Sequence, residues 1–162
     1  MTGAFTKAQH LVRRFIGHVS ARPLSPAEQE FVDQHLSASC AALFWLQSAA
    51  DQRHAFKSGY RVAVALPDDG EAVEAALLHD IGKWKPYIGP IPRSIATLLD
   101  LARLPMTGNM RAYRDHGRLG AEQLEAAGCG GLAVEFARNH SQSTIDGADA
   151  ERWHVLYEAD RS

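Results

Sequence analysis

The chain has 162 residues and a formal net charge of −2, which suits one domain and gives no reason to expect nucleic acid or a membrane as the main partner. Apolar residues make up 46% of it, enough for a core that offsets lost conformational entropy. There is no signal-peptide pattern and no apolar run near the roughly 20 residues of a membrane span, so we expect a cytoplasmic protein. Cys40 and Cys129 lack CxxC spacing, and we expect them to be reduced thiols that fill the core.

Helical spacing of apolar residues begins near the N-terminus and continues along the chain. Residues 4–18 are expected to form a first helix with one apolar side. Ser25-Pro26-Ala27-Glu28 predicts a helix start, because serine caps, proline suits the first turn and glutamate can reach back to the cap amide. Residues 41–47 are apolar nearly all round, which predicts a buried helix. Ser48, followed by Asp51, predicts the start of the next one.

The second half of the chain continues the helical pattern. Residues 71–79 are expected to form an apolar helix, and the stretch 84–92, with three prolines, is expected to be a loop. Further helices are expected over 95–104, through 118–127, over 132–140 and from 148 to the end. We find no convincing strand pattern or repeat. The expected fold is therefore all-α, a single domain over 1–162 with seven to nine helices in an irregular or orthogonal bundle, to which residues 1–40 add a helical extension.

The segment AALLHDIGK places His79 and Asp80 at the end of a strongly apolar helix. Burying an ionised carboxylate beside an imidazole is costly unless something compensates its charge, and a divalent cation does so. Imidazole and carboxylate are suitable ligands for iron, manganese, nickel or zinc. Alternatively, Asp80 caps a neighbouring helix and His79 is a hydrogen-bonded core residue. The dipeptide alone leaves both interpretations open.

Other metal-ligating residue types follow in a characteristic order. They are His54 in DQRHAF, His116 in YRDHGRLGAE, His140 in ARNHSQ and Asp160 in YEADRS. Together with the HD pair they give H…HD…H…H…D, which resembles the HD domain superfamily of metal-dependent phosphohydrolases. The resemblance runs from about residue 44 to the C-terminus and includes Gly82-Lys83 and Gly120-Ala121-Glu122.

This resemblance implies a set of metal ligands. The first metal would be held by His54, His79, Asp80 and Asp160, and the second by His116 and His140. Asp80 would bridge the two ions and act as a catalytic residue. Lys83 would lie near the metals as a second catalytic residue and neutralise a phosphate oxygen. The expected cofactors are two divalent ions, drawn from Fe, Mn, Ni, Zn and Mg.

Several residues near these ligands are candidates for supporting roles. Those that could bind an anionic substrate are Arg53, Lys83, Arg114 and Arg118. Arginines spaced like those around His116 more often lie only on a solvated helix face. Asp51 could orient His54 from the second shell, or only cap its helix. We expect a small phosphorylated or anionic substrate, no nucleic acid or membrane partner, and leave a homodimer open. Residues 1–40 would cover the active-site mouth, form a dimer face or complete the core.

Three classes of function are compatible with the resemblance. The first is hydrolysis of a phosphomonoester, phosphodiester or nucleotide by a metal-activated water. The alternative is a di-iron oxygenase that cleaves a C–C or C–P bond with O₂, because such enzymes have a similar ligand set. A non-catalytic regulatory domain is disfavoured, since no ligand position is lost. The expected activity is therefore that of an HD-type metal-dependent hydrolase.

Overall fold

The computed structural model describes residues 22–84, 99, 105–147 and 149–162. These ranges form eight α-helices and one short 3-10 helix, without a strand. In chain order they are α2 (Pro26–His35), α3 (Ala38–Trp45), α4 (Ala49–Ala65), α5 (Gly70–Leu78), η1 (Ile81–Lys83), α7 (Gly108–Arg114), α8 (His116–Ala127), α9 (Gly131–Asn139) and α10 (Ala150–Arg161). The prediction of an all-α bundle of seven to nine helices is confirmed. None of the described helices has the length and apolarity that crossing a membrane requires.

Two helices begin at the capping residues that predict them. At α2, the Ser25 hydroxyl accepts from the Glu28 amide, and the Glu28 carboxylate accepts from the Ser25 amide at 2.6 Å. At α4, the Ser48 hydroxyl accepts from the amide of Asp51. These contacts satisfy amides that have no partner within the first turn of a helix, so the helix starts follow from local chemistry.

The helix α3 differs from the expectations in its start, in its burial and in the state of its cysteine. It begins at Ala38, before the predicted start, and only its Cys40 and Phe44 are buried, while the following Leu46 is half exposed. It is therefore not buried all round but packs one stripe on the core. Cys40 is bonded to Cys129 in a disulfide, so the prediction of two reduced thiols is wrong. The two cysteines are 89 residues apart, and no local spacing signals that the fold brings them together.

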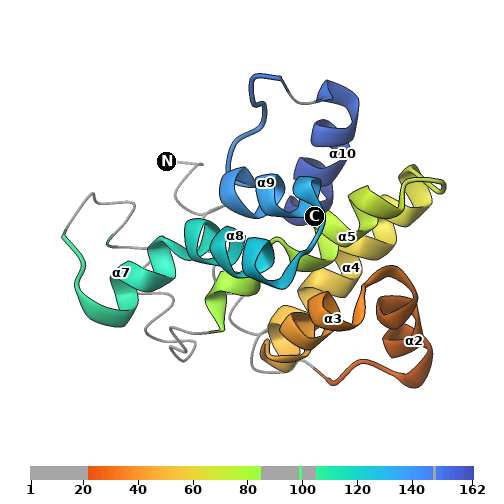
Figure 1. Cartoon of the computed structure of the whole chain (residues 1–162), viewed down its shortest axis with the longest axis horizontal. Helices are drawn as coiled ribbons and strands as arrows, with labels where there is room; N and C mark the ends of the chain where they lie inside the picture. Colours follow the sequence, from red (N-terminus) through yellow and green to blue (C-terminus); the bar gives the residue numbers. More distant parts are fainter. Residues whose placement is uncertain (1–21, 85–98, 100–104, 148) are drawn as a thin grey trace, which may run out of the picture.

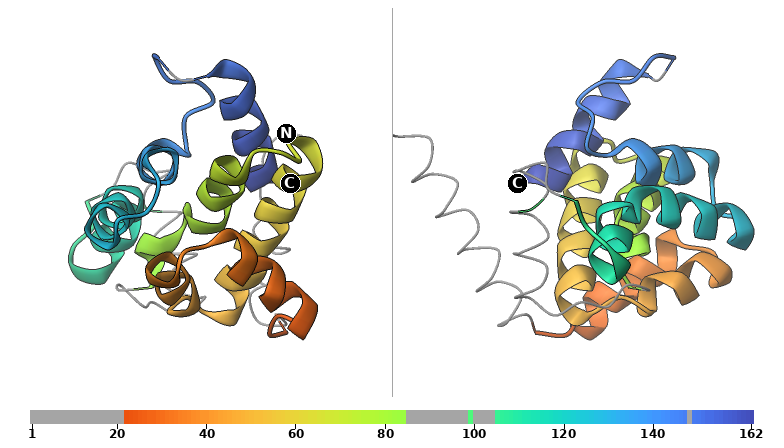
Figure 2. Two further views of the ribbon diagram at one scale, coloured as in Figure 1. Left: turned by 45° about the vertical axis from the view of Figure 1, so that its right-hand side comes forward. Right: turned by 90° about the vertical axis from the view of Figure 1, so that its left-hand side faces the viewer.

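The helix α5 lies in the middle of the bundle and contacts α4, α9 and α10. It is buried along most of its length, including Ala72, Ala75, Ala76, Leu77 and Leu78. A helix that is apolar on all sides is stable only within a core, and its alanines allow neighbouring helices to approach. In Figures 1 and 2, α10 lies on the other side of the α4–α5 pair from α2 and α3. His79 and Asp80, which follow the C-terminal end of α5, therefore lie in the protein interior.

Two glycines allow η1 to pack directly against α8. A Cβ atom on Gly82 would lie 1.9 Å from the carbonyl oxygen of His116, and one on Gly120 would lie 2.9 Å from the amide nitrogen of Gly82. Neither distance is possible without moving the backbone. The absence of side chains at these two positions thus brings the start of α8 next to the end of α5.

The helices α8 and α9 form a hairpin, and α10 packs beside α4 and α5. Gly128 ends α8 in the left-handed region, with φ of 72°, and α9 runs back along α8. His116 at the start of α8 and His140 just after α9 consequently lie at the same end of the hairpin. Trp153 and Leu156 are buried and anchor α10, as their apolar character predicts.

Some predicted elements fall outside the described residues. These are the helix over 4–18, the loop after Trp84 and almost all of the helix over 95–104. Within the described part of the predicted extension, α2 contacts both α3 and α5. This part of the extension therefore shares the core of the domain.

Candidate metal centre

The six residues that the motif order selects come together from separate elements. They are His54 on α4, His79 and Asp80 between α5 and η1, His116 on α8, His140 just after α9 and Asp160 on α10. His79 and Asp80 are buried, whereas the His54 side chain is 38% exposed and the most accessible of the six. The cluster therefore opens towards solvent on the side of His54.

His54, His79 and Asp80 form a first group of ligand atoms within 4.8 Å of one another, and Asp160 contacts both imidazoles of this group. The Oδ1 atom of Asp160 lies 2.9 Å from Nε2 of His54 and 2.9 Å from Nε2 of His79. The Oδ2 atom of Asp80 lies 3.5 Å from Nε2 of His79 and 3.9 Å from that of His54. Ligand atoms about 2.1 Å from one ion are roughly 3.0–3.4 Å from each other in octahedral or tetrahedral geometry. The observed separations are close to this range, so these side chains could hold a metal ion.

Asp80 also belongs to a second group of ligand atoms. Its Oδ1 atom lies 3.3 Å from Nε2 of His116 and 3.8 Å from Nε2 of His140. The two imidazole Nε2 atoms are 3.3 Å apart. All three ligand atoms lie within 4.8 Å of one another, so this group could hold a metal ion as well. Asp80 thus offers one carboxylate oxygen to each group.

The backbone fixes which nitrogen of two histidines faces the cluster. The Nδ1 atom of His79 lies 2.8 Å from the carbonyl oxygen of Ala76, and Nδ1 of His140 lies 2.9 Å from that of Ala137. Because a carbonyl oxygen only accepts hydrogen bonds, Nδ1 must carry the proton in both rings. The accepting carbonyls lie in the last turns of α5 and α9, where helix carbonyls lack intrahelical partners. In its neutral form each ring therefore presents an Nε2 lone pair to the cluster, as metal-ligating histidines do.

Two buried atoms of the cluster lack an aligned hydrogen bond among the described residues, namely Nε2 of His79 and Oδ1 of Asp80. Asp160 and His116 come within 2.9 and 3.3 Å of them, so the contacts are close but not oriented as donor and acceptor. A buried polar atom left without a hydrogen bond costs about 1–3 kcal/mol. A cation within each group would satisfy both atoms, and the donor set therefore fits metal ions.

The carboxylates of the cluster are held in their charged form. Burial raises the pKa of Asp80, but the charges of Lys83 and His79 outweigh it and hold this pKa well below its usual range. The Lys83 ammonium pairs directly with Asp80. For Asp160, burial is likewise outweighed, mainly by His79 and by a hydrogen bond with His54, so its pKa is also lowered. Both carboxylates are therefore ionised, as metal ligands must be.

The buried histidines differ in how readily they bind a proton. Burial lowers the pKa of His79, but the charges of Asp80 and Asp160 outweigh it and raise this pKa to about 10. The pKa of His140 is lowered to about 4, mainly by burial, with nearby cationic groups adding to the effect. His140 is thus neutral at neutral pH, whereas a metal ion at Nε2 of His79 would have to compete with a proton.

The other predicted site residues are placed in several ways. Lys83 is buried on η1 and contacts Asp80. Arg53 forms an ion pair with Glu28, and its guanidinium donates to the Pro23 carbonyl at 2.6 Å. Arg53 therefore ties α4 to the start of α2, and its assignment to substrate binding stays a prediction.

The remaining three candidates form local contacts near the helix ends. Asp51 accepts from the Ser48 hydroxyl at 2.6 Å, and Ser48 is the residue that caps α4; both roles named for Asp51 stay predictions. Arg114 pairs with the adjacent Asp115, and Arg118 pairs with Glu122 one turn along α8. Both arginine side chains are exposed. These ion pairs are of the kind expected for a solvated helix face.

Sequence reasoning did not identify the residues that fix the C-terminal end of α10. The Ser58 hydroxyl lies 3.2 Å from the carbonyl oxygens of both His54 and Ala159. Arg61 donates to the carbonyl oxygen of Ser162 at 3.1 Å. Asp160 is therefore held in place although it is next to the chain end. Ser58 and Arg61 follow His54 by four and seven residues, on the same face of α4, and this spacing could have identified them.

Comparison of the chain with protein-family models, curated proteins and solved structures finds no match. The resemblance to HD domains therefore stays a prediction from motif order. The case for a metal centre depends on the positions of the six side chains and on the two buried atoms without aligned partners.

Proposed function

We propose that the chain is a metal-dependent phosphohydrolase that cleaves a phosphomonoester, a phosphodiester or a nucleotide. The observation that carries this proposal is the pair of ligand groups that share Asp80, with Nε2 of His79 and Oδ1 of Asp80 buried and not aligned with a hydrogen-bond partner. In this proposal one group holds a first divalent ion and the other a second, with Asp80 as the bridge.

The chain's own residues would prepare this centre for hydrolysis. Two divalent ions held in this way supply Lewis acidity and a water of lowered pKa. The carbonyls of Ala76 and Ala137 orient His79 and His140, so the ligands need little rearrangement. Lys83 keeps Asp80 ionised and fixes one of its oxygens. The exposure of His54 gives an anionic substrate its direction of approach.

The proposed reaction requires no nucleophilic side chain, and the six clustered residues are all imidazoles or carboxylates. Metal-assisted hydrolysis uses such donors to position water and to offset charge that develops on phosphate oxygens. The geometry supports metal binding, and the motif resemblance supports a phosphate ester as the substrate. The two lines of support are independent because distances between side chains are not encoded in motif order.

Turnover in the absence of oxygen tests the proposal most directly. The full chain is purified anaerobically, loaded with Mn²⁺ or Ni²⁺, and assayed with p-nitrophenyl phosphate, bis(p-nitrophenyl) phosphate and nucleoside monophosphates. We expect hydrolysis of at least one of these esters and its loss on chelation. His79→Ala is expected to lower the rate by at least about 100-fold, because it removes a ligand rather than a group that merely supports one.

A matched variant separates the metal centre from general damage to the fold. His154 is exposed and lies on α10, the helix that carries Asp160, so His154→Ala should leave metal content and rate unchanged. Activity that requires iron and oxygen, and is absent without oxygen, would replace the hydrolase by an oxygenase. Unchanged metal binding in His79→Ala would contradict the proposed centre itself.

A further inference from the structure

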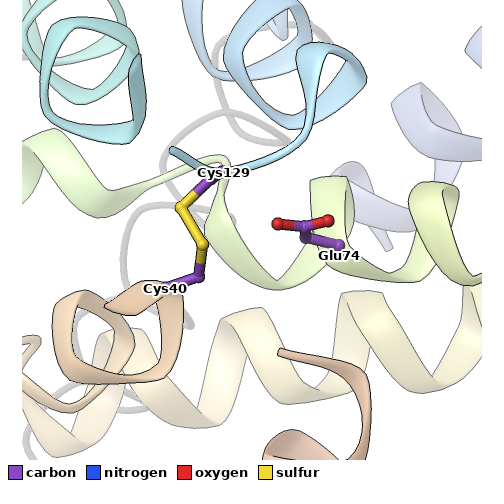
Figure 3. Close-up of side chains that lie close together, drawn as sticks. All are labelled: Cys40, Glu74 and Cys129. Atoms are coloured by element: carbon purple, nitrogen blue, oxygen red, sulfur yellow. A yellow bond between two sulfur atoms is a disulfide. The ribbon is translucent and has the colours of Figure 1, made fainter. Parts of the chain in front are cut away.

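A second cluster of ligand-type side chains lies outside the His/Asp centre. It consists of Cys40 on α3, Glu74 on α5 and Cys129 in the turn between α8 and α9 (Figure 3). The two sulfur atoms and a Glu74 oxygen lie within 4.8 Å of one another. The sulfurs are joined as a disulfide, and the carboxylate lies beside it (Figure 3).

Glu74 is the member of this cluster that a disulfide alone does not explain. Its partly buried carboxylate accepts a hydrogen bond from the Gly130 amide at 3.2 Å, and it forms no ion pair with the part of the chain that the structure describes. Gly130 also leaves room for it, since a Cβ atom there would lie 3.0 Å from a Glu74 oxygen. A carboxylate oxygen thus lies next to two sulfur atoms, and no cationic side chain among the described residues pairs with it.

We propose that reduction of the Cys40–Cys129 disulfide creates a binding site for a thiophilic divalent cation of the zinc class. A dithiol reduces the S–S bond to two thiols by supplying two electrons and two protons, and becomes a disulfide itself. A phosphine supplies the two electrons and becomes a phosphine oxide, while water supplies the two protons and the oxygen. The cation then displaces the two thiol protons and binds both thiolates together with the Glu74 carboxylate. Three protein ligands leave one tetrahedral position for water.

The positions of the three side chains favour such a site over a pair of free thiols. The Cα atoms of the two cysteines are 5.9 Å apart, so both sulfur atoms can reach a common point between them. The two thiolates of a tetrahedral zinc site are about 3.8 Å apart, because each Zn–S bond is about 2.3 Å. Side-chain rotation can supply this separation with the backbones in place.

Charge explains why the cation is needed. Cys40 is completely buried, and burial opposes thiolate formation. Two thiolates and one carboxylate carry three negative charges, of which a divalent cation offsets two. The bound cation would also link α3, α5 and the α8–α9 turn, so the same elements would stay connected after the disulfide is broken.

The thiolate-to-cobalt charge-transfer absorption provides a probe that responds only to sulfur ligands. The full chain is reduced with a phosphine, freed of metal and titrated anaerobically with Co²⁺, while the near-ultraviolet thiolate-to-cobalt charge-transfer absorption is recorded. We expect the absorption to saturate with one thiolate-bound cobalt per chain and to disappear on addition of Zn²⁺. The His/Asp centre contains no sulfur, so this result does not depend on the proposed hydrolase function.

Variants assign the ligands of this site. Cys129→Ser should abolish the charge-transfer band, and the oxidised wild-type chain should not show it. Glu74→Gln should weaken cobalt binding at least about tenfold, because an amide is a poorer ligand than a carboxylate for such a cation. Glu135→Gln is the matched control, since Glu135 is exposed on α9, and it should bind cobalt like the wild type.

Three results would overturn the proposal. One is a reduced, helical chain that shows no charge-transfer band while a thiol reagent titrates both cysteines as free. Another is unchanged cobalt affinity in Glu74→Gln. The third is a loss of helical circular dichroism on reduction that Zn²⁺ does not restore.

Discussion

Asp80 faces both ligand groups, with Oδ2 near His54 and His79 and Oδ1 near His116 and His140. We therefore predict that Asp80→Asn weakens binding at both positions, by at least about 100-fold for each ion. His116→Ala should weaken only one position. Metal content per chain after equilibration with Mn²⁺, measured by mass spectrometry, should fall from two in the wild type to one in His116→Ala and to none in Asp80→Asn. Equal losses in the two variants would contradict separate groups that share Asp80.

Protonation of His79 would give the proposed metal centre a defined pH dependence. The carboxylates of Asp80 and Asp160 outweigh burial and raise the pKa of His79 to about 10, so a metal ion must displace a proton from Nε2 at neutral pH. Mn²⁺ affinity should then increase about tenfold per pH unit between roughly pH 7 and 9, as for release of one proton. Calorimetric titrations in buffers of different ionisation enthalpy count the protons released. An affinity that is constant over this range would show that His79 does not compete for a proton.

At the residue scale, the sequence predicted the identities of the clustered side chains better than their geometry. His79 and Asp80 stand out because an imidazole and a carboxylate follow an apolar helix. The orientation of the imidazole could not be predicted, because it depends on the carbonyl oxygen of Ala76, and every residue type has this group. The ion pair that Arg53 forms with Glu28 on another helix could not be predicted either. Such partners become visible only when helices are packed.

The contact between η1 and α8 depends on two positions without side chains. A Cβ atom on Gly82 would meet the His116 carbonyl oxygen at 1.9 Å, so Gly82→Ala must push the start of α8 away. We predict a loss of about 3 kcal/mol in the free energy of unfolding and weaker binding of the ion at His116 and His140. Urea unfolding and Mn²⁺ content measure the two effects. Gly131→Ala is the control, because no atom lies within 4 Å of a Cβ built there, and equal effects of both variants would contradict the prediction.

Asp69 connects the start of α5 to α10, the helix that carries Asp160. Its carboxylate accepts from the Ala72 amide at 3.0 Å and from two nitrogens of Arg152 at 2.6 and 2.7 Å. The bond with Arg152 is the main reason that its pKa is below the usual 3.8. Asp69→Asn should lower the free energy of unfolding by about 1 kcal/mol at pH 7, given the partial exposure of this pair.

The pH dependence of this loss checks its electrostatic origin. Because the pKa of Asp69 is lowered by folding, its stabilising effect is present above the unfolded pKa of about 3.9 and disappears as the pH falls through the folded value. The difference between wild type and Asp69→Asn should therefore shrink below about pH 4. Asp68→Asn alters an exposed neighbour and should leave the stability unchanged. A loss that is the same at pH 7 and pH 3 would point to packing instead.

At the element scale, two helix starts could be predicted because a serine side chain caps its own helix, whereas the cap that Ser37 forms at the start of α3 was missed. Ser25 and Ser48 form such local caps. The environment of α3 was predicted less well, because its composition is apolar while only Cys40 and Phe44 are buried. The composition of a helix limits how much apolar surface it can bury. How much it does bury depends on which neighbouring helices pack against it.

At the scale of the whole molecule, the disulfide joins α3 to the hairpin that carries His116 and His140. Cys129 lies in the turn of this hairpin, and the two histidines lie at its other end. The bond closes a sequence separation of 89 residues. It restricts the unfolded chain far more than the folded one, since the folded helices already place the cysteines side by side. The free energy of unfolding should therefore depend on whether the disulfide is oxidised or reduced.

This argument leads to a prediction for the wild-type chain with a chelator present. Restriction of the unfolded chain by a cross-link over this length corresponds to about 4–5 kcal/mol, of which strain and residual structure commonly remove part. We expect the oxidised chain to unfold at a higher urea concentration than the reduced chain, by about 2–4 kcal/mol. The variant Cys40→Ala/Cys129→Ala should show no dependence on the reductant, which isolates the cross-link from other effects of reduction. Coincident unfolding curves for the oxidised and reduced wild type would mean that the helices alone determine the stability of the bundle.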